Sequence, residues 1–119
     1  MMKRAALIIA MLIAAPLYAQ NPNGNLAAPV VTRTASAALN ASSEIDLCDA
    51  TAGAVTLTLP PASAQARVSV NKIDSSANAC TIKAAGSDTM QGGLTTSVLA
   101  TQGAAHTYVG NGGTVDEVF

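Results

Sequence analysis

Aromatic residues are scarce in this sequence, which has no tryptophan, two tyrosines and one phenylalanine among 119 residues. A hydrophobic core must therefore be built from Val, Leu, Ile, Ala and Met, and it buries less area per residue than an aromatic core. A glycosidase would need two convergent carboxylates in a sugar-binding cleft, which so few aromatic rings disfavour. We interpret the carboxylate pairs that do occur as solvated charges on turns and strand edges. These pairs are Asp46 with Asp49 and Asp116 with Glu117.

Charged residues and histidine are also few. Six basic and seven acidic residues give a net charge of −1, and no basic patch exists that would attract nucleic acid. His106 is the single histidine. It would have to serve any Ser or Cys nucleophile as base, but no GxSxG sequence provides the setting for one. Asp46, Asp49 and Asp88 have no metal-ligand spacing with it. We therefore expect a strand histidine at the surface or half-buried, no catalytic residue, no metal and no cofactor.

No apolar run approaches the roughly 20 residues that span a membrane. The run AALIIAMLIAA at residues 5–15 follows a basic start and precedes Ala19 and a polar stretch. This order predicts a secretory signal peptide over residues 1–19, cleaved after Ala19, and a secreted, periplasmic or cell-surface protein with no stable membrane insertion after cleavage. An uncleaved membrane anchor is the alternative.

The mature chain divides into two parts. Asn, Pro and Gly punctuate residues 20–33, which we interpret as a flexible linker. Residues 34–119 are predicted to form an all-β domain, because Thr, Val and Ser abound and turn residues recur every eight to twelve positions. We expect a small antiparallel β-sandwich or β-roll of about seven short strands. The clearest strand candidates are 44–48, 54–59, 67–70, 80–84, 97–101, 104–109 and 114–119.

The apolar pattern also predicts which faces point inward. Val55, Leu57 and Leu59 alternate with threonines and are expected to face the core, whereas Ile45 and Leu47 form the apolar face of the strand before them. The alternation slips after residue 70, because Ile73 rather than Lys72 is the next apolar residue. That slip suggests a bulge or twist near residue 71.

Cys48 and Cys80 are the only cysteines, and both lie in the part predicted to be exported. Because an oxidising compartment favours pairing, we predict a Cys48–Cys80 disulfide, with two separate buried thiols as the alternative. Closing a loop of about 33 residues would contribute roughly 3–4 kcal/mol to stability. No CxxC sequence is present, so a redox-active role is not expected.

Three segments resemble a small β module found in bacteriophage and prophage tail fibres and tail-associated proteins. They are VTLTLPPA at 55–62, VNKIDSSANA at 70–79 and GSDTMQG at 86–92. The resemblance implies a structural role and an assembly of several copies, most often threefold. Cys48 and Cys80 depart from the module's usual residues, and a virion protein made in the cytoplasm needs no signal peptide.

The sequence thus favours an exported, non-catalytic structural or binding module that resembles a tail-fibre domain. Its expected partners are copies of itself, a trimer being favoured, and a cell-surface or virion protein. One rival is a surface adhesin or pilus-like subunit that uses residues 20–43 as a donor strand or tether. A second rival is a small secreted hydrolase or an inhibitor of one.

Overall fold

Strands dominate the structure, a computed structural model that describes residues 28–118. The prediction of a mostly β protein is confirmed for this part of the chain, in which no helix is long and apolar enough to cross a membrane. Residues 28–118 form nine strands rather than about seven, together with two short 3-10 helices, η1 (Ala62–Ala64) and η2 (Gln91–Gly93). The strands are β1 (Val30–Arg33), β2 (Ala37–Ala38), β3 (Glu44–Cys48), β4 (Val55–Thr58), β5 (Arg67–Lys72), β6 (Cys80–Lys83), β7 (Thr96–Leu99), β8 (Ala105–Gly110) and β9 (Val115–Val118).

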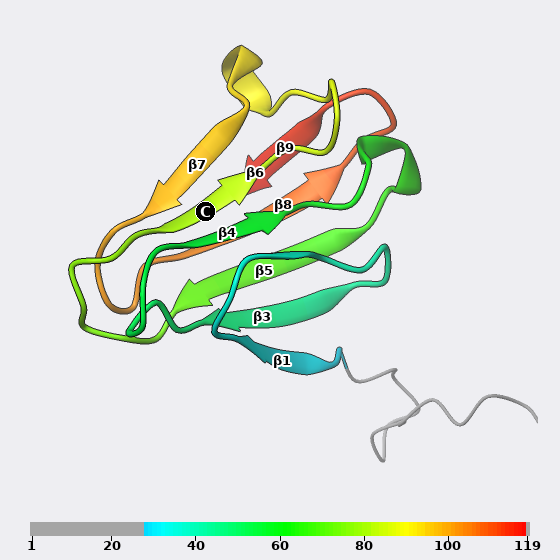
Figure 1. Cartoon of the computed structure of the whole chain (residues 1–119). Coiled ribbons are helices and arrows are strands. Elements are labelled where there is room, and N and C mark those ends of the chain that lie inside the picture. Colours follow the sequence, from blue (N-terminus) through cyan, green and yellow to red (C-terminus); the bar gives the residue numbers. More distant parts are fainter. Residues whose placement is uncertain (1–27, 119) are drawn as a thin grey trace, which may run out of the picture.

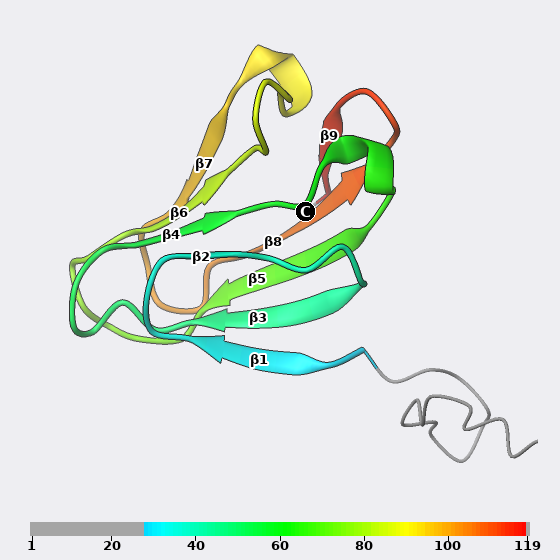
Figure 2. The same cartoon turned by 45° about the vertical axis from the view of Figure 1, so that its right-hand side comes forward.

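The strands form two sheets that lie one over the other (Figures 1 and 2). Sheet 1 has the order β1-β3-β5-β8-β9, and sheet 2 has the order β2-β4-β6-β7. From β1 to β6 the chain crosses to the other sheet after every strand, so it winds as a flattened coil of three turns. The last strands, β7 to β9, then complete the two sheets.

The expectation of an antiparallel arrangement is wrong for this coil. β1, β3 and β5 pair in parallel, as do β2, β4 and β6, whereas only the pairs that involve β7, β8 and β9 are antiparallel. The physical reason lies in the connections. A turn that leads to the opposite sheet has the same Gly, Pro, Ser and Asn content as a hairpin turn, so composition does not report where the next strand pairs.

The core lies between the sheets and takes alternate residues from both. Its members include Val55 and Leu57 from β4, Val68 and Val70 from β5, and Ile82 from β6, all with 0–1 % exposure. Leu59, just beyond β4, is buried as well. The predicted inner face of residues 55–59 is therefore confirmed, because alternation with a period of two identifies the buried face whatever the strand direction.

The predicted linker ends earlier than expected. Residues 30–33 form β1, which pairs with β3, and residues 37–38 form β2, which pairs with β4. Their sequence shows no clean alternation, and Val30 has 60 % of its surface exposed. Pairing with the rest of the coil therefore specifies these strands, rather than a pattern of their own. The predicted signal peptide and residues 20–27 lie outside the described residues.

Two predicted faces are inverted or shifted. On β3, Glu44, Asp46 and Cys48 are buried, whereas Ile45 is 37 % exposed on the outer side. β5 alternates regularly to its end with no bulge, so that Lys72 is fully buried and Ile73 is 37 % exposed. Both errors have one cause. The apolar residues were taken to mark the inner face, but each buried charged residue has a partner of opposite charge.

Candidate functional site

The described surface offers little enclosed space. A shallow groove of about 240 Å³ lies at the start of β1, β3 and β5. Its lining residues are Ala28, Ser43, Glu44, Ile45, Arg67 and Ser69. A second hollow, beneath Pro60 and Pro61, has room for about one water molecule at ≈ 10 Å³. Both are smaller than the roughly 300–1,000 Å³ of typical small-molecule pockets, so the chemistry must be sought in the side-chain clusters.

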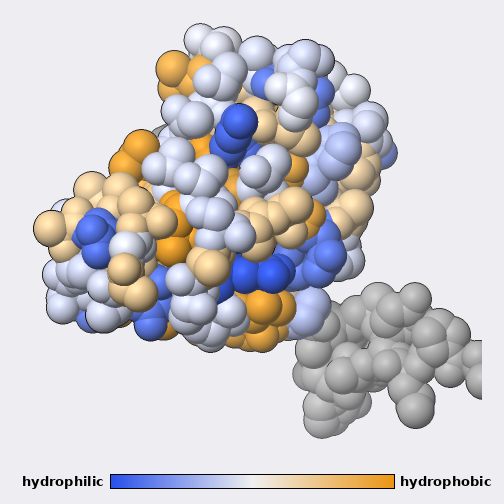
Figure 3. Space-filling view, in the orientation of Figure 1, coloured by the Kyte–Doolittle hydropathy of each residue, from blue (hydrophilic) through white to orange (hydrophobic). Residues whose placement is uncertain are grey.

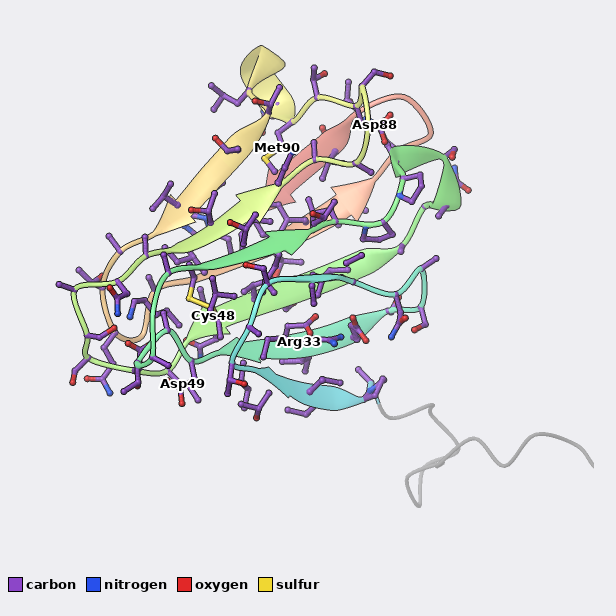
Figure 4. The ribbon with its side chains drawn as sticks, in the orientation of Figure 1. Arg33, Cys48, Asp49, Asp88 and Met90 are labelled. Carbon is purple, nitrogen blue, oxygen red and sulfur yellow. A yellow bond between two sulfur atoms is a disulfide. The ribbon has the colours of Figure 1, made fainter. Side chains whose placement is uncertain are left out.

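A buried charge cluster connects the first two turns of the coil. Nε of Arg33 donates to Oδ1 of Asp46 at 2.7 Å, and its Nη2 donates to Oε1 of Glu44 at 3.2 Å. Asn40, in the turn before β3, donates to the same glutamate from its backbone N–H at 3.2 Å and from Nδ2 at 3.4 Å. Because β1 supplies the arginine and β3 supplies both carboxylates, this cluster attaches the edge strand β1 to β3 (Figure 4).

The cluster holds more negative than positive charge. The side chains of Glu44 and Asp46 are 1 % and 0 % exposed, against 19 % for Arg33. Oδ2 of Asp46 is buried and has no hydrogen-bond partner in the described structure. Burial raises the pKa of Asp46 and Glu44 raises it further, while the hydrogen bond from Arg33 opposes both. The same hydrogen bond raises the pKa of Arg33.

Sequence reasoning missed this cluster, although one signal was available. Cys48 was predicted to form a disulfide with Cys80, which the structure places in the interior, and residues 44, 46 and 48 share one strand face. Placing Cys48 inside therefore also places Glu44 and Asp46 inside, where burial requires a cation for them.

A second network lies in the segment KIDSSAN, residues 72–78. Nζ of the buried Lys72 donates to Oδ2 of Asp74 at 2.7 Å and to the carbonyl oxygens of Asp74 and Ser76 at 3.0 and 3.3 Å. The hydroxyl and the backbone N–H of Ser76 also donate to Oδ2 of Asp74. The hydrogen bond from Lys72, followed by that from the Ser76 hydroxyl, lowers the pKa of Asp74 well below its usual range.

The same segment clamps a neighbouring turn through Ala50. The Ala50 N–H donates to Oδ1 of Asp74 at 2.8 Å. Its carbonyl oxygen accepts from Nδ2 of Asn78 at 2.8 Å and from the hydroxyl of Ser76 at 3.2 Å. The polar side chains of this motif therefore satisfy the backbone of a buried residue between β3 and β4.

The LPPA and GSDTM segments also contact each other. The N–H of Ala62, at the start of η1, donates to Oδ2 of Asp88 at 2.9 Å. The Ala62 carbonyl oxygen accepts from the N–H of Gly112 at 3.0 Å. Gly110 passes so close that a Cβ on it would lie 2.7 Å from that oxygen. Figure 4 shows Asp88 and Met90 at this end of the molecule. Asp88 therefore holds a backbone donor here.

The predicted disulfide is present. Cys48 of β3 and Cys80 of β6 are bonded at an S–S distance of 2.05 Å, and the bridge joins sheet 1 to sheet 2 in the interior (Figure 4). Neither cysteine is exposed. The disulfide, together with the core, therefore connects the second and third turns of the coil.

His106 is half-buried on β8, as the sequence predicted. Its Nδ1 lies 3.4 Å from Oγ of Ser97 on β7 and 3.5 Å from the hydroxyl of Tyr108, itself only 1 % exposed. Both distances are at the long limit of hydrogen bonding. The three side chains form a polar cluster that connects β7 of sheet 2 to β8 of sheet 1.

The carboxylate pairs noted in the sequence do not converge. Asp46 is buried, whereas Oδ1 of Asp49, outside, accepts from the hydroxyl and the N–H of Thr51 at 2.6 and 3.0 Å. Asp116 accepts from Nδ2 of Asn111 at 3.1 Å. Among the described residues no three His, Cys, Asp or Glu side chains are grouped so as to hold a metal ion. The side chain of Glu117 lies outside the described part.

Comparison of the chain with protein families and with curated protein sequences gave no match.

Proposed function

We propose that this chain is an exported, non-catalytic structural or binding module of tail-fibre type. One observation carries the proposal. The segments that resemble the tail-fibre module use their polar side chains to hold their own backbone. Asp74 and Asn78 bind Ala50, and Asp88 binds Ala62. Groups engaged in this way maintain a shape and present no reactive atom to a substrate.

Export is supported by two independent features. The N-terminal 19 residues have the basic start and apolar run of a signal peptide. The disulfide is of a kind that persists in oxidising compartments and is rare in the cytosol. A disulfide between the sheets also strengthens a core that contains one aromatic ring, Tyr108, among its buried members.

A β-roll describes the fold best, since the chain alternates between the sheets from β1 to β6. A roll of stacked parallel turns forms a rigid, elongated unit, and its outer sheet faces are available for contacts with other proteins. We expect it to act as a homo-oligomer, with a trimer favoured by the resemblance to tail fibres.

The adhesin alternative receives less support. It uses residues 20–43 as a donor strand or tether. The donor-strand form is disfavoured, because β1 and β2, which belong to this segment, pair with β3 and β4 of their own chain. The hydrolase alternative would have to use the Ser97–His106 contact of 3.4 Å.

Two measurements on the protein recovered from the periplasm or medium test the proposal. Its intact mass should equal that of a chain that begins at Gln20. It should also lie about 2 Da below the mass of the reduced form, because one disulfide removes two hydrogen atoms. Full-length protein confined to the cytosol would contradict export. In a panel of ester, peptide and glycoside substrates we expect no turnover above that of the His106→Ala variant. An activity that this substitution abolishes would overturn the non-catalytic role.

A further inference from the structure

The centre of the outer face of sheet 1 consists of apolar and hydroxyl side chains, whereas a solvated sheet face usually has charged residues there. Its middle row, in register across four strands, consists of Val30, Ile45, Ser69 and Thr107. Val30 is 60 % exposed and Ile45 is 37 % exposed. We call the outward side chains of β1, β3, β5, β8 and β9 the sheet-1 face.

Charge is confined to one end of the sheet-1 face. Its charged members among the described side chains are Arg67, the first residue of β5, and Asp116 on the edge strand β9, and both belong to the row of Val109. The middle row and the row of Leu47 carry none. Protein interfaces have this anatomy, with charged residues depleted from the centre and kept at the rim.

The polar groups of the middle row are already paired. Oγ of Ser69 and Oγ1 of Thr107 lie 2.9 Å apart and share a hydrogen bond across β5 and β8. Covering these two side chains therefore leaves neither hydroxyl without a partner, which lowers the desolvation cost at the centre of an interface. Asn71, in the row of Leu47, differs, because its Oδ1 has no hydrogen-bond partner in the described structure.

The area of the sheet-1 face is close to the minimum that self-association requires. Five strands about 4.8 Å apart, each about four or five residues long, give a plane of roughly 20 by 16 Å. With side-chain relief this corresponds to about 500 Å² of accessible surface per copy. Two such faces bury about 1,000 Å² in total, which is near the lower limit for a specific interface.

The outer face of sheet 2 is less suitable. Its central rows contain Thr56, Thr58, Thr81 and Lys83, so a cation stands beside the hydroxyls. Figure 3, in which sheet 2 is toward the viewer, shows hydrophobic areas separated by hydrophilic ones. Val98, 54 % exposed on β7, is an isolated apolar residue of this face.

We propose that the sheet-1 face is the surface through which a second copy of this chain binds, burying Val30, Ile45 and Leu47 of each copy. This inference rests on the homo-oligomer of the proposed function. Because the same face of each copy takes part, it specifies a closed dimer in place of the trimer that the resemblance favours. The two sheet-1 faces would pack about 10 Å apart, as sheets do in layered β proteins.

Light scattering on the mature protein at micromolar concentration tests the interface with two matched variants. Ile45→Lys places a charge at the centre of the sheet-1 face, and Val98→Lys places the same charge on sheet 2. We expect wild type and Val98→Lys to have the mass of two chains, and a mass of three chains would overturn the face-to-face contact. Ile45→Lys should have the mass of one chain even at a tenfold higher concentration, with an unchanged circular dichroism spectrum.

Should Ile45→Lys fail to fold, Val30→Lys at the more exposed edge position supplies the same test and should also give one chain. An oligomer broken by Val98→Lys but not by the sheet-1 variants would overturn the interface and leave the oligomer standing. A wild type that stays a single chain on concentration would overturn the oligomer and its interface together, while export and the absence of catalysis would stand on their own tests.

Discussion

Replacing Arg33 with methionine tests the buried charge cluster most directly. The substitution keeps an unbranched apolar stem of similar length but removes the guanidinium that binds both carboxylates. Asp46 and Glu44 would then be left at 0 % and 1 % side-chain exposure without a cation. Breaking a buried pair in this way costs roughly 3–5 kcal/mol.

Partial access to water reduces that cost. The Arg33 side chain is 19 % exposed, so solvent reaches one end of the cluster. We therefore expect the lower end of the range, a loss of about 3 kcal/mol at pH 7. In a domain of this size each kcal/mol lowers the melting temperature by about 4–8 °C, so the Arg33→Met variant should melt more than 10 °C below wild type.

The loss should depend on pH in a defined direction. The pKa of Asp46 is already raised by burial, and removing the guanidinium raises it further. A carboxyl with a raised folded-state pKa contributes stability below its unfolded pKa and loses it as the pH rises through the folded value. The deficit of Arg33→Met should therefore be largest at pH 7 and above, and smaller near pH 4.

Urea denaturation of the oxidised proteins at pH 4 and pH 7 measures both effects. Arg67→Met is the matched control, since Arg67 is exposed and should change stability by less than about 0.5 kcal/mol. A loss below about 1 kcal/mol for Arg33→Met, or an equal loss at both pH values, would refute the reasoning.

Three further predictions concern the close approach at Gly110, the hydrogen bond from Ala50 to Asp74 and the disulfide. Gly110→Ala should lower the free energy of unfolding by about 1–3 kcal/mol in urea denaturation, because the new Cβ would lie 2.7 Å from the Ala62 carbonyl oxygen. Gly113→Ala is the control and should be nearly neutral, because nothing lies within 4 Å of its Cβ position. Equal effects of the two substitutions would contradict the close approach at Gly110. Asp74→Ala should lower the melting temperature at pH 7 by removing the acceptor for the Ala50 N–H. Since the pKa of Asp74 is lowered, its contribution is fully present above the ordinary pKa near 3.8 and declines as the pH falls from there through the lower folded-state pKa. A deficit as large at pH 2 as at pH 7 would therefore count against the clamp. Reduction of the disulfide should cost about 3–4 kcal/mol and lower the melting temperature by more than 10 °C in calorimetry, and a smaller shift than 3 °C would show that the bridge constrains little.

The local pattern predicted most strand positions after residue 43. β3 was predicted with its observed bounds, and 54–59, 80–84 and 104–109 each overlap an observed strand within one or two residues at either end. The Cys48–Cys80 bridge also followed from the sequence, because two cysteines in a chain predicted to be exported leave a single possible intramolecular pairing. These are short-range or combinatorial properties, and they are present in the order of residues along the chain.

Strand direction and the contents of the interior depended on contacts between distant residues. The sequence specifies where turns occur, but only the tertiary structure takes each turn from β1 to β6 across to the opposite sheet and so makes the pairs parallel. Hydrophobicity alone placed Ile45 on the apolar face of its strand and suggested a bulge near Asn71. In the structure Ile45 is 37 % exposed, and regular alternation continues to the buried Lys72. A charge can be buried only where a partner accompanies it. Arg33, from the neighbouring strand β1, is the distant partner of the carboxylates of β3, whereas Asp74 is a local partner that lies two residues beyond Lys72.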